Sequence, residues 1–218
     1  AMTIATEIRD ETLPALDETD FPQNAKRMMR AGIHLFAQKG FAGTSVREIV
    51  QAADVTNPML YYYFDNKEGL YNTLITYLFE HMTGLISARL AEAATLEEAV
   101  DAVILAHFEG CKRSPVALRF VYMVLFGPED SAPDFDMFDR AAQRGKFESH
   151  QQFAPHFLTD LLLGLINQHL MQTLKRIEAY SDRTTRRQKM REMMSEANAR
   201  AIRQFFFSGA GHLKETCQ

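Results

Sequence analysis

The chain has 218 residues, 46% of them hydrophobic, and a formal net charge of −4. This length allows one small module and one larger domain, and the acidic balance excludes a nucleic-acid binder that is basic throughout. Apolar runs of membrane-spanning length do not occur, and neither Cys111 nor Cys217 has the spacing of a metal ligand. We therefore expect a cytoplasmic protein with reduced thiols and without a metal or other cofactor.

The charge of the chain changes sign near its beginning. Residues 1–22 are rich in Asp and Glu and contain Pro14 and Pro22 as breakers, so we predict a disordered acidic tail. From Asn24 to Lys67 the basic residues outnumber the acidic ones. Such a local excess of positive charge is enough to begin contacts with phosphate groups.

Three helices and a tight turn are predicted next. A helix from Asn24 to Lys39 ends at Gly40, which suits a positive backbone φ. Two short helices, at 45–52 and 57–63, flank the small turn at 53–55. This is the layout of a helix-turn-helix, whose second helix enters the major groove of DNA.

The starts of the two short helices carry their own signals. Ser45 and Glu48 form a Ser-x-x-Glu capping box at the first of them. Thr56 suits the cap of the second, and Pro58 lies in its first turn, where a missing N–H costs little. Leu60 is predicted to face inward and Tyr61 and Tyr62 outward, whereas Tyr63 could face either surface.

The stretch from Asn24 to Leu74 resembles the TetR family of bacterial transcriptional regulators. The residues that carry the resemblance are Ala31, Leu35-Phe36, Lys39-Gly40-Phe41, Thr44-Ser45-Val46, Glu48-Ile49, Ala52-Ala53, Val55, Leu60-Tyr61-Tyr62-Tyr63-Phe64 and Asn66-Lys67-Glu68. Leu-Tyr-Tyr-x-Phe with Lys-Glu behind it, at this distance from Gly-Phe and Thr, is far more specific than a helix-turn-helix pattern alone. The resemblance implies a DNA-binding domain here.

The resemblance also implies which residues contact DNA. By position, Thr44 and Tyr62 would bind phosphate, and Lys67 would face a phosphate from the start of a fourth helix. Asn57 is our candidate for pairing with adenine, because its amide matches N6 and N7. The chain departs from the common family pattern Lys-Gly-Thr at Asn57-Pro58-Met59, so base reading would differ. The predicted DNA-contacting residues are Thr44, Ser45, Arg47, Thr56, Asn57, Pro58, Met59, Tyr61, Tyr62, Tyr63 and Lys67.

Helical spacing continues through the rest of the chain. A long helix is predicted from Lys67 to Glu92, and Thr95 with Glu98 forms a second capping box. Further helices are predicted at 95–112, 116–126, 135–144, 155–180 and 184–207. The fold class is therefore all-α, with about nine helices. We expect an N-terminal helix-turn-helix DNA-binding domain of three helices at 23–70 and a larger helical ligand-binding and dimerisation domain at 71–218.

The last two predicted helices carry apolar stripes that are broader than one internal core requires. The resemblance implies a four-helix bundle made by two subunits, and hence a homodimer that binds a near-palindromic operator in double-stranded DNA. The alternative is that both helices are simply buried in a monomer. The predicted dimer interface consists of Leu162, Leu165, Ile166, Leu170, Met194, Ala201 and Phe205.

The middle of the chain is rich in Phe, Met and His, as a pocket for a small molecule would require. Most aromatic residues at helical spacing are ordinary core residues, so this alternative stays open. The candidate pocket residues are His107, Phe108, Cys111, Tyr122, Met123, Phe126, Phe138, Phe157 and His169. The ligand itself is unknown.

Together these patterns indicate a sequence-specific DNA-binding transcriptional regulator. The function that we expect is a homodimeric repressor released from its operator by a small-molecule ligand. A second possibility is an activator, or a DNA-bound factor whose C-terminal domain contacts a protein. A third is an enzyme or small-molecule carrier, but the sequence lacks a nucleophile elbow, a glycine-rich phosphate loop and a His-Glu-x-x-His motif. We therefore expect no enzyme activity.

Overall fold

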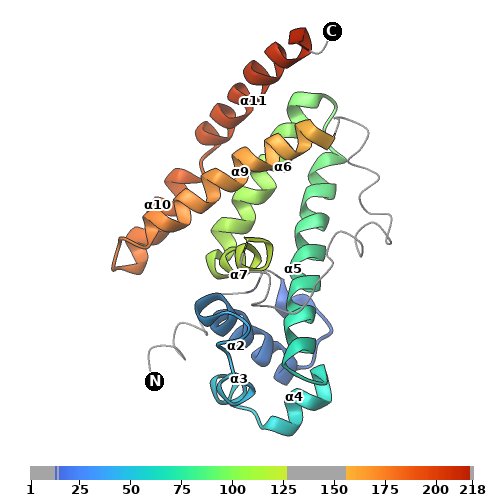
Figure 1. The fold of residues 1–218 in the computed structure, drawn as a ribbon, viewed down its shortest axis with the longest axis vertical. Helices are drawn as coiled ribbons and strands as arrows, with labels where there is room; N and C mark the ends of the chain where they lie inside the picture. Colours follow the sequence, from blue (N-terminus) through green and yellow to red (C-terminus); the bar gives the residue numbers. More distant parts are fainter. Residues whose placement is uncertain (1–12, 14, 127–155, 217–218) are drawn as a thin grey trace. The chain divides into compact units, whose positions relative to one another are not determined.

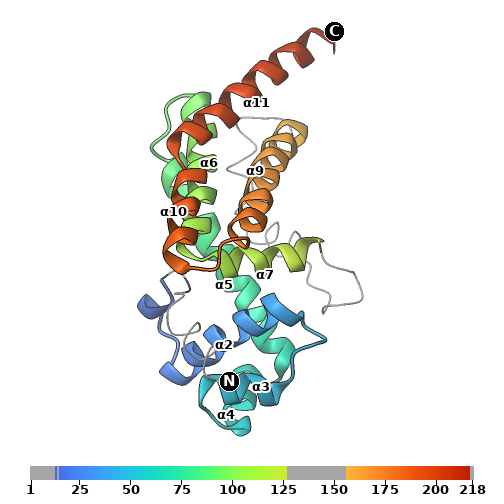
Figure 2. The ribbon, with the colours of Figure 1, turned by 90° about the vertical axis from the view of Figure 1, so that its left-hand side faces the viewer.

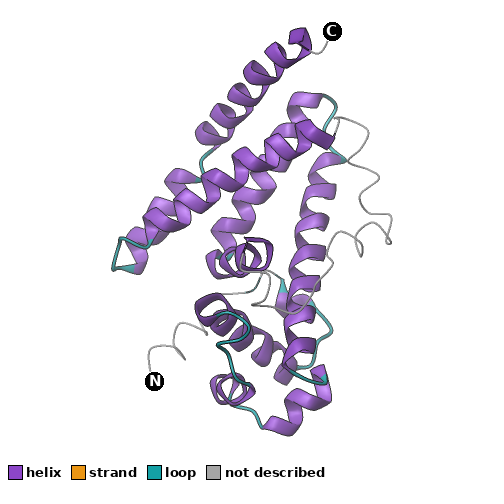
Figure 3. Ribbon diagram, viewed as in Figure 1, coloured by secondary structure: helices purple, strands orange, loops and turns teal. Residues whose placement is uncertain are grey.

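The computed structural model describes residues 13, 15–126 and 156–216, and every element in these ranges is helical (Figures 1 and 3). The all-α expectation is thereby confirmed. The helix predicted at 135–144 lies outside the described residues. The elements are η1 (Leu16–Glu18), α2 (Gln23–Lys39), α3 (Val46–Ala53), α4 (Asn57–Phe64), α5 (Lys67–Leu90), α6 (Leu96–Arg113), α7 (Pro115–Phe126), α9 (His156–Ile177), α10 (Arg183–Met193) and α11 (Glu196–Thr216).

The chain divides into two compact units, and the division differs from the predicted boundary at residue 70. The N-terminal unit contains η1, α2, α3, α4, α5 as far as His81, and α7. The C-terminal unit contains the rest of α5 together with α6, α9, α10 and α11. The predicted boundary falls inside the continuous helix α5, so the DNA-binding module is larger than its three-helix motif.

Helix α7 joins the N-terminal unit through an aromatic cluster. The ring of Phe120 lies 5.1 Å from that of Tyr71 and 6.1 Å from that of Phe36, centroid to centroid. Phe36 and Tyr71 meet edge to face at 5.1 Å. Burial raises the pKa of Tyr71 to about 12. Because α7 is apolar along most of its length, it covers the core of α2 and α5.

The segment before α2 is packed, which corrects the prediction of a disordered tail reaching residue 22. Leu13 and Leu16 are buried in the core of the N-terminal unit. The buried ammonium of Lys26 donates hydrogen bonds to the backbone oxygens of Asp17, at 3.1 Å, and Thr19, at 2.7 Å. A buried lysine needs such partners. Although the segment is acidic overall, two of its leucines belong to the core.

Most of the predicted helix starts and ends are confirmed. Ser45 and Glu48 form the complete capping box of α3. Gly40 ends α2 with a φ of 72°, and the side chain of Asn66 accepts the amide of Gly69 in the first turn of α5. Thr56 is the exception, because its hydroxyl makes no cap hydrogen bond.

The single last helix predicted from residue 184 is wrong, because the structure breaks it into α10 and α11. Met194 leaves helical geometry, with φ −97° and ψ 40°. The amide side chain of Asn198 donates to the backbone oxygen of Met193 at 2.8 Å, and Ser195 Oγ accepts the amide of Asn198 at 3.4 Å. Ser and Asn side chains that bind nearby backbone groups compete with a continuous helix.

Candidate nucleic-acid interface

Helix α4 exposes the face that carries Tyr61 and Tyr62, as predicted. Leu60 and Phe64 are buried in the core, whereas Met59 and Tyr61 are exposed. Tyr62 is the most exposed, with 81% of its surface accessible. In Figure 2, α3 and α4 lie beside each other at one end of the N-terminal unit. This face of α4 is therefore available to a partner.

The three consecutive tyrosines have different environments. Tyr63 is half-buried and packs against the core. Its ring meets that of Tyr62 edge to face, with centroids 4.9 Å apart. Such a contact restricts the orientation of Tyr62. Tyr63 is therefore only partly exposed itself, and its role is to pack against the exposed Tyr62.

The first turn of α4 is also exposed. Thr56, Asn57 and Pro58 all lie at the surface. The amide nitrogen of Asn24, on α2, lies 3.6 Å from the sulfur of Met59. Asn57 and Met59 are thus both exposed at the start of α4, and their part in base reading stays a prediction.

The start of α3 is held by a short chain of polar contacts. The ammonium of Lys39 binds the carboxylate of Glu48, which also accepts the hydroxyl of Ser45 at 2.8 Å. The bond from Lys39, followed by those from Ser45, lowers the pKa of Glu48 to about 2. The carboxylate therefore stays ionised far into the acid range. Arg47, the second residue of the same helix, is exposed.

Thr44 does not lie where a phosphate contact through its hydroxyl would require, which corrects that part of the prediction. The residue is 1% exposed. Its hydroxyl donates to the backbone oxygen of Gly40 at 2.8 Å. The buried hydroxyl of Thr44 therefore stabilises the loop between α2 and α3. The sequence alone did not reveal this hydrogen bond.

Lys67 also points into the fold. Its ammonium donates to the backbone oxygens of Phe41 and Thr44, each at 2.8 Å. It lies 4.0 Å from the centroid of the Phe41 ring, a distance at which a cation is attracted to the ring face. Partial burial lowers the pKa of Lys67.

The other basic residues of the motif are largely paired. Lys26 is buried, as described above. Three ion pairs hold Arg27 to Asp54, Arg30 to Asp17, and Lys39 to Glu48. Exposed pairs of this kind contribute little to stability, but they occupy the charge that a phosphate would otherwise meet. Among the described residues from 24 to 67, Arg47 is the basic side chain for which neither an ion pair nor a hydrogen bond to a backbone oxygen is seen.

Four of the candidate pocket residues lie in the C-terminal unit and form packed core. Phe108 and Cys111 are fully buried. The ring of His169 stacks on Phe108 at 5.2 Å and places Nε2 2.8 Å from the backbone oxygen of Met193. His107 places Nδ1 2.8 Å from the oxygen of Val103, and burial lowers its pKa.

Five other candidate pocket residues remain. Tyr122 and Met123 lie on α7, in the N-terminal unit. Phe138 lies outside the described residues, and nothing is described of the side chains of Phe126 and Phe157. The predicted ligand pocket therefore stays a prediction.

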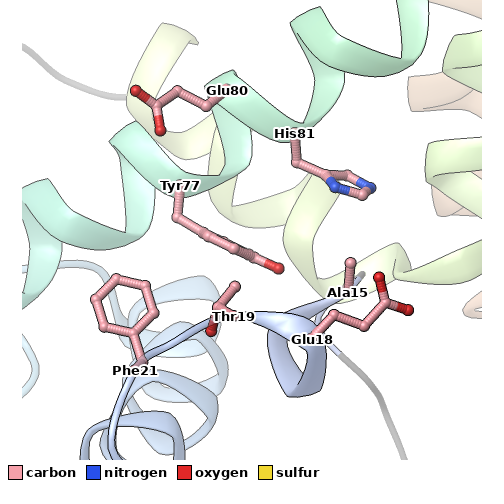
Figure 4. Close-up of a pocket in the computed structure, with 7 residues that line it drawn as sticks. All are labelled: Ala15, Glu18, Thr19, Phe21, Tyr77, Glu80 and His81. Atoms are coloured by element: carbon pink, nitrogen blue, oxygen red, sulfur yellow. The ribbon is translucent and has the colours of Figure 1, made fainter.

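A surface pocket of about 400 Å³, which the sequence did not indicate, lies in the N-terminal unit (Figure 4). Tyr77 projects from α5 toward the segment before α2. Burial, followed by the charge of Glu18, raises the pKa of Tyr77 to about 12. The pocket is lined by Ala15, Glu18, Thr19, Phe21, Tyr77, Glu80 and His81.

The predicted dimer interface is only partly exposed. Leu162, Ile166, Leu170 and Met194 are buried within the chain itself, so the stripe that we assigned to a partner serves the core of the C-terminal unit. Leu165 is half-buried. Ala201 is exposed, and 66% of the surface of Phe205 is accessible. The exposed apolar side chains of α9 are instead Leu161 and Met171.

Residues 28–74 match the family model described as bacterial regulatory proteins, tetR family. The chain is 36% identical over 69 residues to the probable HTH-type transcriptional regulator YttP of Bacillus subtilis, covering 32% of this chain and 33% of the relative. It is 25% identical over 166 residues to the HTH-type transcriptional repressor KstR2 of Rhodococcus jostii, covering 68% of this chain and 81% of the relative. The match thus spans a third of the first relative and four fifths of the second.

The fold is similar to that of solved regulators. The transcriptional regulator FadR from Bacillus subtilis, solved in complex with stearoyl-CoA, superposes with a TM-score of 0.58. The likeness covers 84% of this chain and 97% of that one, at 14% sequence identity. Within the described part of the chain, no helix is both long and apolar enough to cross a membrane.

Proposed function

We propose that this chain, whose residues 28–74 match the model of the tetR family of bacterial regulatory proteins, is a homodimeric, sequence-specific DNA-binding repressor released by a small-molecule ligand. The observation that carries this proposal is the exposed face of α4 on a helix-turn-helix whose residues 28–74 match the family model. The relatives are transcriptional regulators, a class without enzyme activity. We place its action in the cytoplasm, where the chromosome of a bacterium is accessible.

In our proposal, α4 enters the major groove. Asn57 reads a base edge, and Met59 with Tyr61 makes apolar contacts, for example to a thymine methyl. Tyr62 binds phosphate through its hydroxyl, and Arg47 adds a charged phosphate contact from α3. Exposed Ser45, Thr56 and Pro58 lie around these groups, whereas Thr44 acts on the DNA only through the loop that it closes.

The dimer proposal rests on the exposed faces of α9 and α11. Leu161, Gly164, Gln168 and Met171 share one face of α9 at spacings of three and four. On α11 the exposed residues at spacings of four are Ala197, Ala201 and Phe205. A twofold dimer joined through these faces would place two α4 helices in successive major grooves, about 34 Å apart, on a near-palindromic operator.

A small-molecule effector would act by shifting the population of dimers away from the form that fits the operator. The FadR structure with stearoyl-CoA makes acyl-CoA thioesters a sensible first class of probe. At 14% identity the likeness does not identify the ligand of this chain. Operator affinity that stays constant across a panel of bound ligands would contradict release by an effector.

The runner-up function keeps DNA binding but reverses its effect, as an activator or a DNA-bound factor with a protein partner. A reporter fused to the selected operator separates the two. Deletion of the gene raises expression under a repressor and lowers it under an activator. Loss of regulation without loss of DNA binding, after changes confined to the C-terminal unit, would favour a protein partner.

Selection of bound duplexes from a random DNA pool, with purified protein at moderate salt, tests the proposed function. We expect enrichment of a near-palindrome whose half-sites are about 10 base pairs apart, or a multiple of that spacing. The selected sequence also supplies the operator for the measurements below. A folded dimer that enriches no sequence, with and without acyl-CoA probes, would contradict sequence-specific binding.

Tyr62→Ala should lower operator affinity about 10-fold, because one hydrogen bond to phosphate is lost. The thermal midpoint should stay close to that of the parent protein, since the side chain is exposed. Tyr180→Ala is a matched control, because Tyr180 is also exposed but lies in the C-terminal unit. Equal affinities for the two variants, measured by fluorescence anisotropy, would contradict a role for Tyr62 at the DNA.

A further inference from the structure

We propose that Lys67 is a positioning residue for DNA binding, whose ammonium clamps the loop between α2 and α3 instead of binding phosphate. The clamp fixes the place from which α3 presents Ser45 and Arg47. This inference rests on the proposed DNA-binding function. It differs from the phosphate contact that the sequence suggested for the same residue.

The contacts of Lys67 join segments that are distant in sequence. Lys67 is the first residue of α5, and its two acceptors lie 26 and 23 residues earlier, at Phe41 and Thr44. Both N···O distances are 2.8 Å, which is typical of charge-assisted hydrogen bonds. The ring of Phe41 occupies a further side of the ammonium, at 4.0 Å. Two of the three N–H donors are thus committed, and an aromatic face covers part of the remaining surface.

The ammonium is the donor seen for the backbone oxygen of Thr44, whereas the oxygen of Phe41 also accepts the amide of Thr44 at 3.3 Å. Thr44 is buried, so its backbone oxygen would be left without a partner if the ammonium moved out to a phosphate. Leaving a buried acceptor unsatisfied costs about 1–3 kcal/mol. A new contact with phosphate at the surface would have to exceed that cost and the lost attraction to the Phe41 ring. The inward position is therefore favoured with DNA present as well.

The loop leads directly into the DNA-facing helix. Gly40 has a φ of 72° and accepts the hydroxyl of Thr44 at 2.8 Å, so the loop is tightly folded. Phe41 anchors it to the core, with its ring 5.0 Å from Tyr71. Ser45, the next residue, caps α3. Displacement of the carbonyl groups that Lys67 holds would move the cap, and with it the exposed Arg47.

Lys67→Met and Arg47→Ala together distinguish positioning from phosphate binding. Each phosphate contact adds about 0.9 to the slope of log affinity against log salt concentration. We expect Lys67→Met to lower operator affinity roughly 10-fold, a loss of about 1.4 kcal/mol. Combined with Arg47→Ala, it should leave the slope of the Arg47→Ala variant unchanged, because the phosphate contact that a misplaced α3 loses is then already absent. Arg47→Ala should lower the slope by about one. A slope that Lys67→Met lowers by about one more in the Arg47→Ala background would overturn the proposal.

A purely structural role predicts a different result. Lys67→Met would then lower the thermal midpoint but leave operator affinity intact well below that temperature, and this outcome also overturns the proposal. Lys67→Arg keeps a donor and should restore part of the affinity lost in Lys67→Met. Should Lys67→Met fail to fold, Phe41→Leu and Lys67→Arg take its place in the same salt titration.

Hydrogen exchange of the DNA-free protein tests the clamp when no operator is found. In Lys67→Met the amides of residues 44–48 should exchange faster than in the parent protein, while those of α7 stay protected. Unchanged exchange at 44–48 would overturn the clamp. Parent protein that binds no DNA but shows this local change would instead contradict the proposed function and leave the clamp in place.

Discussion

Replacing both Ala201 and Phe205 by glutamate is expected to convert the proposed dimer to a monomer and to lower operator affinity more than about 100-fold. The two positions are exposed on α11, and Phe205 has 66% of its surface accessible. A twofold interface would bury four new carboxylates, and burying unpaired charges is strongly unfavourable. A monomer presents a single α4 and loses the gain from simultaneous binding at two half-sites. Sedimentation velocity and fluorescence anisotropy measure the two effects.

Leu96→Glu is the matched control for that variant. Leu96 is a comparably placed exposed apolar residue at the start of α6, where a carboxylate is compatible with the helix N-terminus. It should leave the dimer and the operator affinity unchanged. A dimer that survives both glutamates on α11 would show that the subunits associate through a different face.

Leu16→Ala is expected to lower the free energy of unfolding by about 2–5 kcal/mol, the range for a fully buried leucine. Leu16 has no accessible surface and belongs to the core of the N-terminal unit. Urea denaturation followed by circular dichroism measures the loss. The result would establish that the acidic segment before α2 is part of the DNA-binding module.

Two controls at the same segment make this result specific. Leu16→Met conserves volume and should cost less than about 1.5 kcal/mol. Asp20→Ala, at an exposed site, should stay within about 0.5 kcal/mol of the parent protein. A loss below 1 kcal/mol in Leu16→Ala would mean that the segment contributes little to the core, contrary to its burial.

The parts of the fold that the sequence predicted correctly depend on residues close to one another in the chain. The capping box of α3 requires only Ser45 and Glu48, three residues apart, and both contacts are present. The inward Leu60 and outward Tyr62 follow from the period of one short helix. The break between α10 and α11 also has a local cause, because the side chains of Ser195 and Asn198 bind nearby backbone groups. The regular apolar spacing across residues 184–207 nevertheless led to the prediction of one continuous helix.

The charge of the DNA-binding surface could not be obtained by counting residues. Six basic residues lie between 24 and 67, but their partners are distant in sequence. Arg27 pairs with Asp54, and Arg30 pairs with Asp17 in the segment expected to be disordered. These pairings depend on the packing of that segment against α2. We therefore expect a smaller dependence of DNA affinity on salt than the residue count suggests.

The sequence by itself determined the resemblance to tetR regulators over residues 24–74, the all-α class and the exposed edge of α4, because these follow from local spacing, caps and a contiguous motif. Only the tertiary structure decided that Leu16 belongs to the core, that Ile166 and Leu170 face inward, and that Lys67 binds two carbonyl groups. An apolar stripe shows that a residue will be buried but not against which neighbour. Likewise, the acceptor that a cation binds is one that lies close to it in the folded chain, and the sequence alone does not show which residues those are.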